Sequence, residues 1–339
     1  MEKKYFSLLN VSILISMGLG FTGCMGNVIK LGDYKKVTLQ KAKYAPSAEK
    51  LKKQSRAKVI IQDIDNNSIP TAKKAQLGKS MASTINKELS ENKNVRILKR
   101  VSSTTDIKEE IKAAEIGKGV GGDVGQADYL LTGKISNSTY SNEFQEATKS
   151  TDKDGKTSYS PPKIKYKACV EGTLKVFSLP NLKEVESASF DECSSSSEEA
   201  RSPSDAKQTN GTLERRASTE AMNSVAYKLK SFFTPKAYIQ AMKKNEDKII
   251  LKVTVGKKQG AKEGDAVQIF KMTNDGPVQI GTGEITNKIT NNNAWITVDD
   301  IEEDESIKQG NYVKVIYKES FLSKGLKGLD YGGLTKLIK

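Results

Sequence analysis

The chain has 339 residues, which is long for one domain and suits two. It contains no histidine, which excludes Ser-His-Asp and Cys-His catalysis and removes the commonest transition-metal ligand. The formal net charge of +14 comes almost wholly from lysine, so it favours anionic lipid, lipopolysaccharide or peptidoglycan over base-specific nucleic-acid readout, which relies on arginine. The alternative is a lysine-rich composition without a specific partner.

Residues 1–24 have the pattern of a bacterial lipoprotein signal. Lys3 and Lys4 precede a nearly uncharged run over residues 6–21, and Phe21-Thr22-Gly23-Cys24 places small residues before a cysteine. The run is too short for a membrane-spanning helix of about 20 apolar residues. The alternative is a buried N-terminal helix that happens to end at a cysteine. We expect residues 1–23 to be removed and Cys24 to carry acyl chains such as palmitate. Because Met25 is not an aspartate, we expect the periplasmic face of the outer membrane.

Residues 24–56 are polar and lysine-rich with no sustained period, which predicts a lipidated tether. Fully stretched, residues 25–56 would reach about 100 Å.

Strands and helices then alternate over residues 57–234, which predicts an α+β domain with helices packed on a mixed or antiparallel sheet. The β-branched run at 57–64 predicts a buried strand, and Leu77, Met81, Ile85 and Leu89 share one helical face. The remaining predicted elements are a strand at 95–98, a helix at 107–114, a glycine-rich stop at 117–125, a strand at 127–135 and a helix at 218–233 capped by Ser218.

Three motifs resemble ligand sites and fail on context. Gly78-Lys79-Ser80 resembles the end of a phosphate-binding loop, but Lys73 stands where the first glycine belongs. The glycine pattern at 117–122 follows a helix and precedes a strand, which reverses the dinucleotide-binding order. The acidic run at 299–305 lacks calcium-loop spacing. We therefore predict no catalytic residues, metal ligands or cofactor site, and no enzyme activity.

Cys169 and Cys193 lie on two predicted strands, 170–179 and 183–190, with a turn at Pro180-Asn181-Leu182. If the hairpin is centred on Asn181, facing residue numbers sum to 362, and the two cysteines then face each other at disulfide distance. A single bulge would break this register, and two free thiols are the alternative.

Residues 235–318 change to short strands and tight turns, which predicts a small β-barrel of the SH3-like or OB-like kind. The phrase at 262–269 recurs at 308–315, with Gly264-Asp265 and Gly310-Asn311 turns before each strand. Such a module is usually a binding domain. The predicted strands are 249–253, 266–270, 280–285, 294–298 and 312–316, and residues 319–339 form a basic C-terminal tail.

The order of pieces over residues 57–233 resembles the curli secretion channel (CsgG-like) family of outer-membrane lipoproteins. The resemblance rests on the lipobox, strand 58–64, the phrase Ala127-Asp128-Tyr129-Leu130-Leu131-Thr132-Gly133, the strand–turn–strand 172–187 and the helix 218–233, and covers about half of the chain. Residues 248–317 are more weakly similar to the C-terminal domain of FlgT-type flagellar periplasmic proteins.

In the secretion channel, two inserts form hairpins that pair into a transmembrane barrel. The equivalent stretches here, 141–162 and 191–216, are rich in serine and charge and offer no lipid-facing apolar row. We expect them to be long soluble loops, and we expect the protein not to conduct.

The resemblance implies a non-enzymatic scaffold or assembly factor for an envelope machine, either a flagellar ring or a surface-export system. The expected partners are membrane lipid through Cys24, an envelope protein and further copies of the chain, without nucleic acid. The alternatives are an activator of a peptidoglycan synthase, which a long tether would favour, and a CsgG-type channel subunit.

Overall fold

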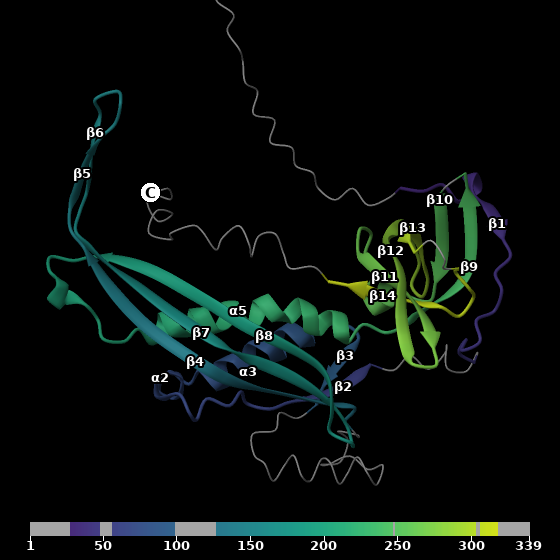
Figure 1. The fold of residues 1–339 in the computed structure, drawn as a ribbon, viewed down its shortest axis with the longest axis horizontal. Helices are drawn as coiled ribbons and strands as arrows, with labels where there is room; N and C mark the ends of the chain where they lie inside the picture. Colours follow the sequence, from purple (N-terminus) through teal and green to yellow (C-terminus); the bar gives the residue numbers. More distant parts are fainter. Residues whose placement is uncertain (1–27, 48–55, 99–126, 247, 303–305, 318–339) are drawn as a thin grey trace, which may run out of the picture.

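The computed structural model describes residues 28–47, 56–98, 127–246, 248–302 and 306–317. Figure 1 shows two bodies along the longest axis, a long curved sheet with its helices and a compact barrel. Most of the regular structure is β: a five-stranded sheet, a seven-stranded sheet and a separate two-stranded arm. The predicted helix 107–114 and the glycine segment 117–125 lie outside the described residues.

The first body is built on the five-stranded sheet, in the order β3-β2-β4-β7-β8. Strand β2 is parallel to both of its neighbours, β3 and β4, whereas β7 is antiparallel to both β4 and β8. The elements are β2 (Ala57–Ile61), α2 (Pro70–Lys74), α3 (Leu77–Ser90), β3 (Val95–Ile97), β4 (Tyr129–Gln145), β7 (Lys163–Ser178), β8 (Lys183–Glu199) and α5 (Gly211–Phe232).

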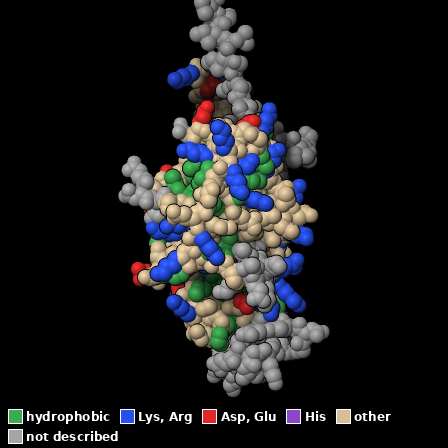
Figure 2. Space-filling model, turned by 90° about the vertical axis from the view of Figure 1, so that its right-hand side faces the viewer, with side chains coloured by type: hydrophobic (Ala, Val, Ile, Leu, Met, Phe, Trp, Pro, Cys, Tyr) green, Lys and Arg blue, Asp and Glu red, His purple; other side chains and the backbone are tan. Residues whose placement is uncertain are grey.

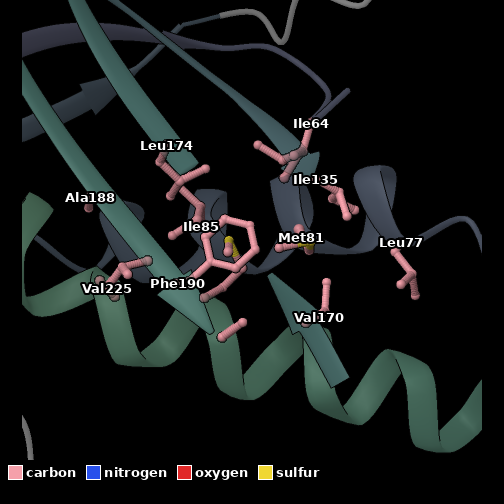
Figure 3. Close-up of a cluster of buried hydrophobic side chains, with 14 of the residues drawn as sticks. Ile64, Leu77, Met81, Ile85, Ile135, Val170, Leu174, Ala188, Phe190 and Val225 are labelled. Carbon is pink, nitrogen blue, oxygen red and sulfur yellow. The ribbon is translucent and has the colours of Figure 1, made fainter. Parts of the chain in front are cut away.

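Helices α3 and α5 share one hydrophobic core with one face of this sheet. Met81 and Ile85 of α3 are fully buried, as predicted from their spacing, and meet Phe190 and Leu174 from the strands (Figure 3). Burial of such a continuous apolar stripe is what stabilises an amphipathic helix on a sheet. The opposite face of the sheet carries the polar residues that alternate with these.

The structure corrects the expectation that residues 141–162 and 191–216 are loops. Strands β4 and β8 each extend over 17 residues, and β5 (Thr148–Thr151) pairs with β6 (Thr157–Ser160) in an arm beyond their far end (Figure 1). The reason lies in β7, which pairs with both β4 and β8. Every second residue of β7 is buried in the core, namely Ile164, Tyr166, Ala168 and Val170, and the polar residues of β4 and β8 pair with this strand. Strands with one solvent-facing side tolerate this serine and charge content. Further on, η3 (Pro203–Asp205) precedes α5.

Two helix boundaries also differ from the prediction. The predicted helix over 77–89 is preceded by the short α2, and Gln76, at φ 55°, separates the two. Helix α5 begins at Gly211 because the Asn210 side chain accepts the amide of Leu213. Ser218 is therefore buried inside the helix, where its hydroxyl donates to the Arg215 carbonyl.

The second body is a closed six-stranded barrel, which confirms the predicted β-barrel. Its strands are β9 (Ala237–Asn245), β10 (Lys248–Val253), β11 (Ala266–Thr273), β12 (Gly276–Ile289), β13 (Ala294–Ile301) and β14 (Tyr312–Ile316), and β9 pairs with β14 to close it. The sequence prediction missed β9, whose polar and half-buried residues show weak alternation. The short 3-10 helix η4 (Lys257–Gln259) connects β10 toward β11.

The repeated phrase forms the same turn twice. Gly264 and Gly310 both have positive φ, at 84° and 94°, a conformation that glycine adopts without strain. The side chain of the residue after each glycine accepts a hydrogen bond from the backbone amide three positions before it. Lys262 N donates to Asp265 Oδ2 at 2.8 Å, and Lys308 N donates to Asn311 Oδ1 at 2.7 Å. The two turns lead into β11 and β14, which are antiparallel neighbours. The repeated phrase therefore has a structural role, which is to form the turns that precede two paired strands of the barrel.

Candidate functional surfaces

Residues 28–47 of the predicted tether are held on the barrel, so this described part is not a free linker. It contains η1 (Leu31–Asp33) and β1 (Lys35–Val37), and β1 pairs antiparallel with β9. This pairing uses the part of β9 beyond its contact with β14. Ile29 is 5% exposed, so this apolar residue of the lysine-rich segment is buried.

Besides its pairing with β9, this segment makes further hydrogen bonds to residues far along the chain. The Ile29 amide donates to Asn287 Oδ1 at 3.1 Å, and Lys243 Nζ donates to the Leu31 carbonyl at 2.7 Å. Further along, the Ala42 amide donates to the Gln309 carbonyl and the Gln309 amide to the Gln40 carbonyl, both at 2.8 Å. Because the partners come from β9, β12 and the approach to β14, residues 29–42 are part of the barrel domain.

This attachment fixes how far the barrel lies from the predicted anchor. Cys24 lies outside the described residues, and Val28 is the first residue described. Residues 25–27 lie between them, and the four steps from Cys24 to Val28 span about 14 Å at full extension. Acyl chains on Cys24 would therefore hold the barrel close to the membrane surface.

The two bodies meet at the C-terminal end of α5. The Thr234 hydroxyl lies 3.1 Å from the carbonyl oxygens of both Lys230 and Val315, and the Tyr317 amide donates to Ser231 Oγ at 2.9 Å. On the neighbouring side, Asn94 Nδ2 donates to the Gln259 carbonyl at 2.9 Å. These bonds join α5 and the turn after α3 to the barrel.

A lysine reinforces the same junction. Lys314 Nζ donates to the Phe232 carbonyl at 3.3 Å, where the C-terminus of a helix favours positive charge. Burial, with the nearby Lys236 as a smaller cause, lowers the pKa of Lys314.

Two clefts flank the junction, with volumes of about 820 and 570 Å³. Lysines line the larger one, of which Lys230 is paired with Glu88 at 2.7 Å. Tyr129, Phe232 and Phe233 line the smaller one and contact each other edge to face. Neither lining contains a nucleophile beside a general base.

The cysteines Cys169 and Cys193 face each other on β7 and β8 and are joined by a disulfide. Their pairing follows the predicted sum of 362, but the register near the turn sums to 361, as in Phe177 opposite Glu184. A β-bulge between Val176 and Phe177 shifts the register by one residue and accounts for the difference between the two sums. The bridge lies on the solvent-facing side of the sheet, among Lys167, Glu171 and their neighbours.

The arm formed by β5 and β6 projects at the opposite end of the molecule from β1 (Figure 1). All eight of its strand residues are exposed, and the Tyr159 side chain is 66% exposed. The arm therefore adds nothing to either core.

Within the described ranges, no three His, Cys, Asp or Glu residues are grouped to hold a metal ion. None of the helices in these ranges combines the length and apolar character needed to cross a bilayer.

Comparison with known proteins gives only remote structural similarity. No protein-family model matches the chain, and neither does any curated protein. A lipoprotein candidate from Caulobacter crescentus aligns at 12% identity over 51% of this chain and 88% of its own, with a TM-score of 0.26. A PelC variant dodecamer from Paraburkholderia phytofirmans aligns at 15% identity over 56% and 91%, with a TM-score of 0.25. A candidate homolog of the neuraminyllactose-binding hemagglutinin from Helicobacter pylori aligns at 13% identity over 58% and 90%, with a TM-score of 0.28. Similarity at this level assigns no function.

Proposed function

We propose that this chain is a non-enzymatic, lipid-anchored scaffold or assembly factor on the periplasmic face of the outer membrane. The binding of residues 29–42 to the barrel carries this proposal, because it holds one end of an elongated molecule next to Cys24. The exposed arm lies at the opposite end of the molecule from β1 (Figure 1). Attachment at one end and a projecting strand pair at the other suit a protein that links the membrane to another component.

The junction between the bodies supports a linking role. The hydrogen bonds of Thr234, Ser231 and Asn94 come from different elements, so they restrain the sheet against the barrel in more than one direction. A restrained junction transmits position from the anchored barrel to the arm. The partners suggested by the family resemblance, a flagellar ring or a surface-export system, remain part of this proposal, as does assembly of several copies.

The two alternatives fit these observations less well. Activation of a synthase across peptidoglycan requires a long reach. Residues 28–47 of the tether predicted at 24–56 are instead mostly held on the barrel. A secretion channel requires a lipid-facing apolar row on its strands. Strand β7 instead alternates core residues with Lys165, Lys167, Glu171 and Lys175.

The proposal is tested in cells by combining anchoring with crosslinking. Cys24→Ser should accumulate as an unprocessed precursor and lose the mature outer-membrane form. A photo-crosslinking residue in place of Tyr159 should give an adduct of discrete mass in the parent and lose it in Cys24→Ser. The matched control places the same residue at Asn223, which is exposed on α5. Processing and fractionation of Cys24→Ser like the parent, or equal adducts from both positions, would contradict the scaffold.

A further inference from the structure

The barrel strands nearest to the N-terminal segment carry an unusual density of lysine. Residues 28–37 and 237–253 together contain seven lysines and three acidic residues, Asp33, Glu246 and Asp247, a net charge of +4. Within β1, β9 and β10 themselves there are six lysines and no acidic residue. Figure 2, which views this end of the molecule, shows basic side chains spread over it and few acidic ones.

The strand pairing gathers these lysines at one end of the barrel sheet, on both of its sides. Lys35 faces Lys244 across β1 and β9 on one side and Lys36 faces Lys243 on the other, because neighbouring residues of a strand point to opposite sides. Directly opposed like charges destabilise a strand pair, so their presence has a cost in the isolated protein. An anionic partner would remove that cost.

Not every lysine here is available to a partner. Lys243 is half-buried, donates to the Leu31 carbonyl and lies 5.9 Å from the centre of the Trp295 ring. Its role is to hold the N-terminal segment. We define the lysine face by the exposed members of the group, Lys30, Lys35, Lys36, Lys244 and Lys248.

The position of Cys24 identifies what covers this face. Val28 is 71% exposed and lies within about 14 Å of Cys24, while Lys30 follows two residues later. The potential of an anionic leaflet extends about 8–10 Å into solution at physiological salt. A chain of at most about 14 Å between Cys24 and Val28 is short enough for the barrel to rest on the leaflet, which brings its lysines inside that range.

We propose that the lysine face docks on the anionic phospholipid headgroups of the leaflet that holds Cys24. This inference rests on the proposed lipidation of Cys24. The barrel then lies on the membrane surface, and the sheet with its arm extends from it. The acyl chains and the lysines act as two signals, which together anchor a protein far more stably than one acyl chain does.

The test separates the lysines from the acyl chains. The mature-length chain 24–339 with Cys24→Ser keeps every described residue and carries no lipid. It should bind vesicles of 30% phosphatidylglycerol and 70% phosphatidylethanolamine, should bind phosphatidylcholine vesicles far more weakly, and should lose affinity as salt is raised. Trp295 is the single tryptophan of the chain and lies beside Lys243, so energy transfer from it to a dansyl-labelled lipid reports docking in this orientation.

Replacement of Lys35, Lys36, Lys244 and Lys248 by glutamine should weaken the partition coefficient by about fivefold for each lysine. The matched control replaces Lys149, Lys153, Lys165 and Lys167, which are exposed on the arm and the sheet and change the net charge equally. It should keep most of the affinity and the energy transfer. If the fourfold variant does not fold, Lys35→Gln and Lys244→Gln are measured singly.

Unchanged binding by the lysine-face variant, or an equal loss in the control, would overturn the inference. So would a Cys24→Ser chain that prefers an anionic polysaccharide to these vesicles. Failure of lipidation in cells would overturn the proposed function and leave the vesicle measurement standing, so the two failures are distinguishable.

Discussion

The backbone amide of Ile29 donates to Oδ1 of Asn287 at 3.1 Å, across 258 residues of sequence. Through this bond, a residue only five positions after Cys24 is attached to β12. Asn287→Ala should free the start of the N-terminal segment, because one hydrogen bond contributes about 0.5–1.5 kcal/mol. Amide exchange at residues 29–37 should rise by about two- to tenfold. Asn223→Ala is the control, and unchanged exchange in Asn287→Ala would show that the bond does not hold the segment.

The Cys169–Cys193 bridge should stabilise the long hairpin. In the chain-entropy model a loop of this size contributes about 3 kcal/mol, less any strain in the native state. Replacing both cysteines by serine should lower the denaturant midpoint accordingly, and the reductant dependence of the parent should vanish. Two alkylatable thiols in non-reduced periplasmic protein would exclude the bridge.

Gly78 allows α3 to approach the backbone of Ile64, which follows β2. A Cβ atom at this position would lie 2.0 Å from the Ile64 carbonyl oxygen, which cannot be accommodated without moving the backbone. We expect Gly78→Ala to lower the free energy of unfolding by about 1–3 kcal/mol. Gly32→Ala, where nothing lies within 4 Å, is the matched control. A thermal midpoint for Gly78→Ala equal to that of the parent would contradict the close approach.

The Thr234 hydroxyl bridges α5 and β14 at the junction. Thr234→Val keeps the shape and leaves the buried Val315 carbonyl without this donor, at a cost of about 1–3 kcal/mol. Amide exchange should increase on both sides of the junction while the barrel core stays protected. Thr219→Val, which removes an exposed hydroxyl bound only to its own helix, should change little. Equal effects of the two variants would mean that the Thr234–Val315 hydrogen bond does not stabilise the junction.

Glu214 is 6% exposed, and burial raises the pKa of its carboxyl, against the opposing influence of Lys74 and Arg215. Because the folded-state pKa lies above the unfolded value, the folded protein favours the protonated acid. Below the unfolded pKa, parent and Glu214→Gln should differ little. As the pH rises through the folded pKa the parent loses stability relative to Glu214→Gln, and the difference should then level off. Urea unfolding of both proteins between pH 4 and 7 measures this, and a difference that shrinks with rising pH would contradict it.

The sequence alone predicted elements whose pattern is local. The spacing of Leu77, Met81, Ile85 and Leu89 indicated the buried face of α3, because helical periodicity depends only on neighbouring residues. The glycine and Asp or Asn of the two repeated turns likewise predicted strand starts, since turn conformation is set within four residues. The Cys169–Cys193 pairing was anticipated from spacing, although the bulge near Val176 shows that the assumed centre of the turn was one step off.

The tertiary structure decided what depends on distant partners. Residues 29–42 have no periodicity of their own, and only β9, Asn287 and Gln309 give them a place on the barrel. The polar ends of β4 and β8 become strands because the apolar alternation of β7 lies between them. The lysine face exists for the same reason: Lys35, Lys244 and Lys248 are far apart or unremarkable in sequence, and strand pairing brings them together beside the segment that leads from Cys24.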